Sequence, residues 1–94
     1  MSEACEEPRF RQRPRIAWRE IDGEAVLVDP VRGRMIVLND AGLFLWQALE
    51  SSKNAGELAD SLCESFEVSA EEARRDVGAF LDSLNERNLL EAAE

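Results

Sequence analysis

The segment 25–49 predicts a short hairpin that runs directly into an apolar helix. Its first strand is followed by a turn at 30–33, and then by Arg34–Leu38, which reads Arg-Met-Ile-Val-Leu. This strand is apolar on both faces from Met35 onward, and we expect it to be the last strand of its sheet. A last strand leaves backbone N–H and C=O groups unpaired, so it can accept an incoming strand. The pattern therefore indicates binding rather than chemistry.

A second hairpin precedes this segment. Residues 16–21 can form a strand, and Asp22-Gly23 is the two-residue turn that most strongly signals a tight hairpin, because both positions favour positive φ. Pairing across this turn places Trp18 opposite Leu27. Residues 25–28 are apolar without alternation, as expected of a middle strand that is covered on both sides.

Three helices are predicted after the strands. Asn39 is a good N-cap for the first, which is apolar over most of its circumference. The second spans 55–66, and the capping-box sequence Ser69-Ala-Glu-Glu72 opens the third. The spacing of the third predicts a packed apolar stripe of Ala73, Val77, Phe80, Leu81 and Leu84. Leu89 and Leu90 are expected to fold back against the core. This order predicts an α+β fold, a winged helix–turn–helix in which a three-stranded antiparallel sheet is followed by three helices.

Length and composition suit one domain. The chain has 94 residues, of which 45% are hydrophobic and 33% charged, so it can bury one core of modest size. We expect residues 1–14 to be a flexible tail and residues 15–92 to form the domain. No secretory signal or membrane-spanning stretch is visible, and Cys5 and Cys63 have no metal-ligand spacing. These features favour a cytoplasmic protein.

The charge of −9 is concentrated in the second part of the chain. From Met35 onward, four basic residues stand against thirteen acidic ones. A winged helix–turn–helix regulator that binds DNA is the alternative function, and its third helix would have to approach phosphates. Because the chain from Met35 onward is strongly anionic, charge argues against nucleic acid and favours cationic partners.

Catalysis finds little support. The chain has no histidine and no tyrosine, and it lacks a Gly-rich phosphate loop. Its helical carboxylates have the spacing of an ordinary solvated face. We therefore predict no enzymatic activity, no catalytic residue, no metal site and no cofactor.

A carrier-protein hypothesis rests on Asp60-Ser-Leu62 and Asp82-Ser-Leu84, since a serine in such a tripeptide can accept a phosphopantetheine arm. Both serines fall inside predicted helices, whereas a carrier serine needs an exposed helix start. Chance is the better explanation.

Arginine alternates through Arg9, Arg11, Arg13 and Arg15. In an extended segment these side chains share one side and can bind an acidic partner. The favoured alternative is a solvated arm that lies against the acidic helices of the protein itself. Arginine and Pro14 would also protect the outer edge of the first strand from pairing.

The order and spacing of many short elements resemble the PqqD-like proteins. The resemblance covers roughly residues 18–90 and is carried by Asp22-Gly23, Val26-Leu-Val-Asp-Pro30, Gly33-Arg34, Leu38-Asn39, Gly42, Trp46, Glu57-Leu58, Leu62, Glu72, Asp76-Val77, Phe80-Leu81, Leu84 and Leu89-Leu90. The second helix departs from the family pattern because Lys53-Asn-Ala-Gly56 stands where a Thr or Ser cap is common. Asn88 likewise replaces a frequent Gly.

The resemblance implies a non-catalytic peptide chaperone of cofactor or natural-product biosynthesis. Such a protein binds the leader of a ribosomally made precursor peptide and delivers it to a modifying enzyme, such as a radical S-adenosylmethionine protein or a leader peptidase. The leader would lie as an added strand between the third strand and the third helix. The implied peptide-binding residues are Arg34, Met35, Ile36, Val37, Leu38, Arg74, Arg75, Val77, Gly78 and Leu81. A homodimer formed through the same edge uses the same physics and stays an alternative.

Overall fold

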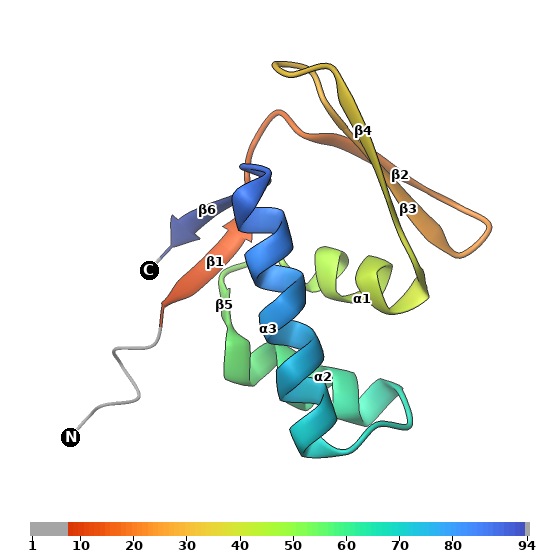
Figure 1. Cartoon of the computed structure of the whole chain (residues 1–94), viewed down its shortest axis with the longest axis vertical. Coiled ribbons are helices and arrows are strands. Elements are labelled where there is room, and N and C mark those ends of the chain that lie inside the picture. Colours follow the sequence, from red (N-terminus) through yellow and green to blue (C-terminus); the bar gives the residue numbers. More distant parts are fainter. Residues whose placement is uncertain (1–7, 94) are drawn as a thin grey trace.

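The computed structural model describes residues 8–93, which form six strands and three helices (Figure 1). The elements are β1 (Arg9–Gln12), β2 (Ala17–Ile21), β3 (Glu24–Asp29), β4 (Arg34–Leu38), α1 (Asp40–Ala48), β5 (Lys53–Asn54), α2 (Ala55–Ser65), α3 (Ala70–Glu86) and β6 (Leu90–Ala93). The α+β class is confirmed, while the winged helix–turn–helix description stays a prediction.

The predicted sheet is antiparallel with the order β2-β3-β4, and β4 has the predicted bounds. Trp18 pairs with Leu27, as the two-residue turn required. Asp22 and Gly23 both have positive φ, at 53° and 81°. The hairpin registers were therefore predictable from local turn chemistry.

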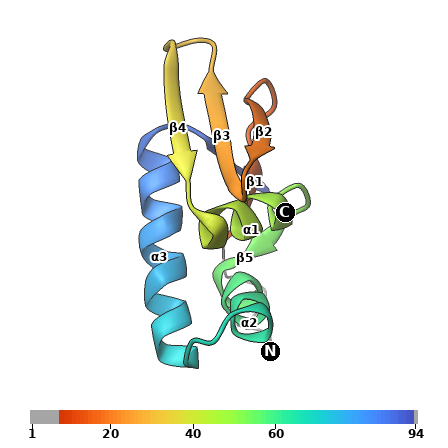
Figure 2. The same ribbon diagram turned by 90° about the vertical axis from the view of Figure 1, so that its right-hand side faces the viewer.

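The inner face of this sheet covers α1 (Figure 2). Ala25 and Leu27 are fully buried there, and the ring of Trp18 meets that of Trp46 edge to face with centroids 6.5 Å apart. Trp46 is itself fully buried. The helix α2 lies below α1, and α3 runs alongside both helices, so that together they complete the core (Figure 2).

Each helix begins at a side-chain cap. The Oδ1 of Asn39 accepts from Gly42 N at 2.9 Å, and Ser69 Oγ accepts from Glu72 N at 3.1 Å. Asn54 and Glu57 form a complete reciprocal capping box on α2. Asn54 therefore caps the helix where the family pattern has Thr or Ser.

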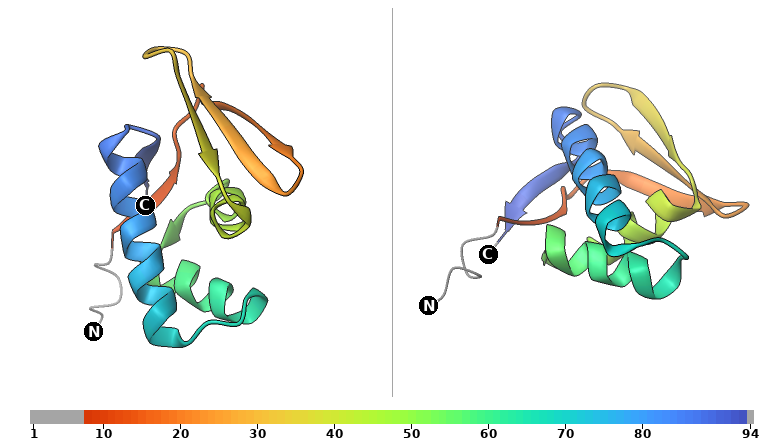
Figure 3. Two further views of the ribbon diagram at one scale, coloured as in Figure 1. Left: turned by 45° about the vertical axis from the view of Figure 1, so that its right-hand side comes forward. Right: turned by 60° about the horizontal axis from the view of Figure 1, so that its bottom comes forward.

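A second, smaller sheet with the order β5-β1-β6 was not predicted. Arg9–Gln12 forms its central strand, so the prediction of a flexible tail over 1–14 is wrong for these residues, while residues 1–7 lie outside the described part. Leu90 is buried as predicted, but it opens the partner strand β6. These pairings join the two ends of the chain, so no local pattern reveals them (Figure 3).

The small sheet also explains two of the alternating arginines. Arg9 donates to Ser52 Oγ at 2.8 Å and lies 3.1 Å from a carboxylate oxygen of Glu57. Arg11 bonds Glu91 at 2.6 Å. The predicted contact with the protein's own acidic helices is thus found for Arg9, whose partner Glu57 lies in α2, whereas the partner of Arg11 lies in the strand β6. None of the helices described in residues 8–93 has the length and apolar content needed to cross a membrane.

We expect the stabilising effect of Glu57 to depend on pH. The backbone N–H of Asn54, aided by the Arg9 guanidinium, holds the pKa of Glu57 below its ordinary value. A pKa lowered by folding contributes stability above the unfolded pKa, and this contribution is lost as pH falls through the folded pKa. Urea unfolding should show wild type to be more stable than Glu57→Gln at pH 7, with the gap closing toward pH ~3. A gap that does not change over this range would contradict the assignment.

Candidate peptide-binding site

β4 is an edge strand of its sheet. It pairs with β3 on one side, and no strand of residues 8–93 pairs with its other side. The opposite edge strand, β2, carries the charged residues Arg19 and Glu20, whereas β4 continues from Arg34 as four apolar residues. β4 is thus the less protected edge against strand addition.

The free backbone groups of β4 can be assigned from the turn that precedes it. Gly33 N donates to Asp29 O at 2.8 Å, so the carbonyl of Asp29 points toward β4. Antiparallel pairing alternates, so Ile36 and Leu38 face β3 in the same way as Arg34. The N–H and C=O groups of Met35 and Val37 therefore point away from β3, in the plane of the sheet, where an added strand would pair with them.

The side chains of β4 alternate between the two faces of the sheet. Ile36 and Leu38 are half-buried and pack against the core, while Met35 and Val37 are 69% and 54% exposed on the outer face. Gly42 allows α1 to start close to this strand, because a Cβ there would meet the Cβ of Leu38 at 2.9 Å.

A pocket of about 490 Å³ opens where β4 passes into α1. One side is the start of α1, and the other is a flank of α3. Its lining residues are Asn39, Ala41, Gly42, Leu45, Leu62, Asp76, Ala79, Phe80 and Ser83. We call this the apolar pocket. Its half-buried aromatic ring, Phe80, and its carboxylate, Asp76, are suited to hold an apolar side chain and to accept a hydrogen bond.

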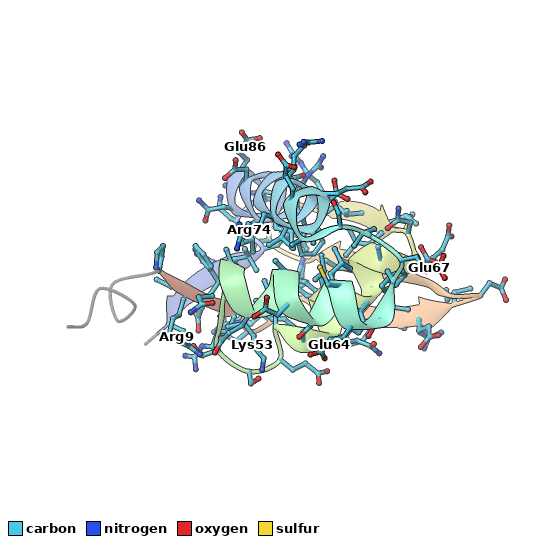
Figure 4. All side chains as sticks on the ribbon, turned by 90° about the horizontal axis from the view of Figure 1, so that it is seen from below. Arg9, Lys53, Glu64, Glu67, Arg74 and Glu86 are labelled. Carbon is cyan, nitrogen blue, oxygen red and sulfur yellow. The ribbon has the colours of Figure 1, made fainter. Side chains whose placement is uncertain are left out.

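The structure brings the predicted β4 residues together at one edge, but it distributes the predicted α3 residues differently. Val77 and Leu81 are buried in the core. Arg74 and Arg75 are exposed, and Figure 4 shows Arg74 on the β6 side of α3. Arg74 and Gly78 are four residues apart and so share a flank, which is not the flank that lines the apolar pocket.

The residues that sequence reasoning missed are on that other flank. Asp76, Phe80 and Ser83 follow the spacing i, i+4, i+7, and Ala79 lies beside them. Phe80 had been assigned to the core stripe, yet it is only half-buried. An aromatic residue at the border of an apolar stripe was the available signal.

The described residues contain no group of three or more His, Cys, Asp or Glu side chains placed to hold a metal ion. The candidate site consists of a bare strand edge, Met35 to Val37, and the apolar pocket beside its end. These features define a small α+β binding domain with an open sheet edge.

The chain belongs to the PqqD family. The family model for coenzyme PQQ synthesis protein D (PqqD) matches residues 24–90, which is most of the chain. A "PqqA binding protein" of Rhizobium meliloti (strain 1021) is 31% identical over 74 residues, covering 70% of this chain and 76% of the relative. The predicted resemblance is confirmed.

Three solved structures share the fold. TbiB1 in complex with the TbiA(beta) leader peptide has a TM-score of 0.79 and 30% identity, covering 86% of this chain and 94% of TbiB1. Lasso peptide synthetase B1 complexed with the leader peptide has a TM-score of 0.74 and 33% identity, covering 90% and 98%. The PqqD truncation of Methylobacterium extorquens PqqCD, at 18% identity and TM-score 0.73, is similar in fold, with 88% of each chain covered.

Hydrogen–deuterium exchange followed by NMR should reveal the alternation along β4. Amides of Met35 and Val37 should exchange fast, because they face solvent, and those of Ile36 and Leu38 slowly, because they face β3. Equal protection of all four amides in dilute protein would show that the body of the monomer covers the edge. Protection of Met35 and Val37 that grows with protein concentration would instead reveal a homodimer through β4.

Proposed function

We propose that this chain is a non-catalytic peptide chaperone that binds the leader of a ribosomal precursor peptide by strand addition to β4. The observation that carries the proposal is the bare edge at Met35 and Val37, which lies next to the apolar pocket. Strand addition is a general way to capture extended peptides, because backbone bonds supply affinity and side-chain pockets supply selectivity. The two relatives solved with leader peptides, at 30% and 33% identity, support it.

Backbone pairing alone cannot hold the peptide. Met35 and Val37 offer two N–H and two C=O groups. Four hydrogen bonds at about 1 kcal/mol each contribute about 4 kcal/mol, and association costs at least that much. Affinity in the micromolar range therefore requires apolar side chains in pockets, at about 1.5–3 kcal/mol each.

The alternation of an added strand determines where those side chains go. Every second residue of the peptide faces inward, on the side of Ile36 and Leu38, toward the apolar pocket. The remaining residues face outward beside Met35 and Val37, which are exposed. The proposal therefore specifies a leader with alternating apolar residues on its inward side.

Chemistry is assigned to a partner. The chain contains no histidine or tyrosine, and its relative from Rhizobium meliloti is named for binding PqqA. We assign the modification step to a separate enzyme, such as a radical S-adenosylmethionine protein or a leader peptidase. Because precursor and enzyme must meet the chaperone where ribosomes release the peptide, the proposed location is the cytoplasm.

Val37→Pro tests the strand edge. Proline removes the outward N–H of Val37 and leaves the bonds to β3 in place, because an edge strand tolerates proline on its solvent side. We expect calorimetric affinity for a leader peptide with alternating apolar residues to fall at least about tenfold, with an unchanged circular dichroism spectrum. Val37→Thr keeps the N–H and is the control. Unchanged affinity in Val37→Pro would rule out β4 as the site.

Ala79→Trp tests the apolar pocket. Ala79 is exposed and lines the pocket, so an indole there should occupy the space without disturbing the core. Because one apolar side chain of the leader could then no longer enter the pocket, leader binding should weaken about tenfold or more. Asn85→Trp places the same group on an exposed position of α3 outside the pocket and should bind as wild type does. Equal affinities for the two variants would exclude the pocket from binding.

A further inference from the structure

A second cavity of about 360 Å³ lies at the far end of β4 from the apolar pocket. Three segments surround it: the linker between β1 and β2, the turn between β3 and β4, and the residues that follow α3. Its lining residues are Arg13, Pro14, Arg15, Ile16, Asp29, Pro30, Val31, Arg32, Asn88 and Glu91. Figure 1 shows the β3–β4 turn and the end of α3 at the same end of the molecule.

The three arginines of this cavity carry unneutralised charge. Arg13, Arg15 and Arg32 are exposed, and no ion pair involves them within residues 8–93. The three arginines outnumber the two acidic lining residues, of which only Glu91 is in an ion pair. Asp29 accepts from Val31 N at 3.0 Å, and Glu91 bonds Arg11 at 2.6 Å. A cationic cavity thus persists in a chain of net charge −9.

The backbone holds these arginines in place. Arg13 N donates to Leu89 O at 3.0 Å, which ties the linker to the C-terminal segment. Arg15 has a φ of 81°, so the linker turns sharply just before β2. The turn that carries Arg32 is closed by the bond from Gly33 N to Asp29 O and by the Asp29 side chain. The cavity is therefore formed by anchored segments from three parts of the chain.

We propose that Arg13, Arg15 and Arg32 bind carboxylates of Asp or Glu residues in the peptide segment just beyond the part paired with β4. This inference rests on the proposed function. Arg32 precedes the start of β4 by two residues, and an extended peptide advances about 3.3 Å per residue. Acidic residues two or three positions past the paired segment therefore reach the cavity.

The chemistry favours a short acidic segment over a polyanion. The guanidinium group donates two parallel hydrogen bonds to a carboxylate. A nucleic acid would bring its phosphates against the anionic helices, whereas a few carboxylates occupy the arginine cavity alone. With apolar side chains at one end of β4 and carboxylates at the other, the peptide can bind in only one direction and register.

The test uses the whole chain and N-acetylated, C-amidated tetraglutamate, followed by amide shifts of Arg32, Gly33 and Asn88. We expect saturable shifts, with affinity lowered about tenfold in Arg32→Glu. Arg19→Glu makes the same change in net charge at an exposed arginine outside the cavity and should bind as wild type does. Absence of saturable shifts, equal weakening in both variants, or equally strong binding of inorganic phosphate would overturn the proposal.

Titrations with the leader peptide separate this inference from the proposed function. A leader whose acidic residues are replaced by the amides should bind wild type more weakly and lose its sensitivity to Arg32→Glu. If the native leader shifts the β4 amides but binds wild type and Arg32→Glu equally, the arginine cavity is excluded and strand addition stands. If the leader shifts no amide of Arg34–Leu38, the proposed function itself fails.

Discussion

The burial of Trp46 is the contact on which the two sheets depend. Its ring is fully buried and packs edge to face with that of Trp18 from the larger sheet. Its carbonyl accepts the side-chain amide of Gln12, the last residue of β1 in the smaller sheet, at 2.8 Å. One residue of α1 therefore positions both sheets. Since α1 follows β4 after a single N-cap residue, the same packing fixes β4 at the sheet edge.

The surfaces around β4 differ in chemistry over a short distance. The apolar pocket lies at the α1 end, the arginine cavity at the turn end, and exposed Met35 and Val37 on the outer face. An edge strand alone pairs with any extended chain, because backbone groups carry no sequence information. Selectivity must come from these flanking surfaces. Under the proposal, one binds apolar side chains and the other binds carboxylates, at opposite ends of the peptide segment that pairs with β4.

The helical phase of α3 shows where sequence reasoning was insufficient. The apolar stripe correctly predicted that Val77, Leu81 and Leu84 are buried. It could not indicate which flank of the helix borders β4. Apolar periodicity shows which face of a helix is buried, but not which neighbouring element each flank contacts. The family resemblance assigned Arg74 and Gly78 to the groove, and that assignment stays a prediction. The apolar pocket is lined from the other flank of α3, by Asp76 and Phe80.

Sequence by itself determined the elements whose physics is local. The two-residue turn at Asp22-Gly23, the caps at Asn39 and Ser69, and the apolar strand of β4 each depend on a few neighbouring residues. Only the tertiary structure placed Arg9–Gln12 between β5 and β6 and gathered Arg13 and Arg32 around one cavity. Those contacts join residues far apart in the chain, and such contacts depend on the packing of the whole core.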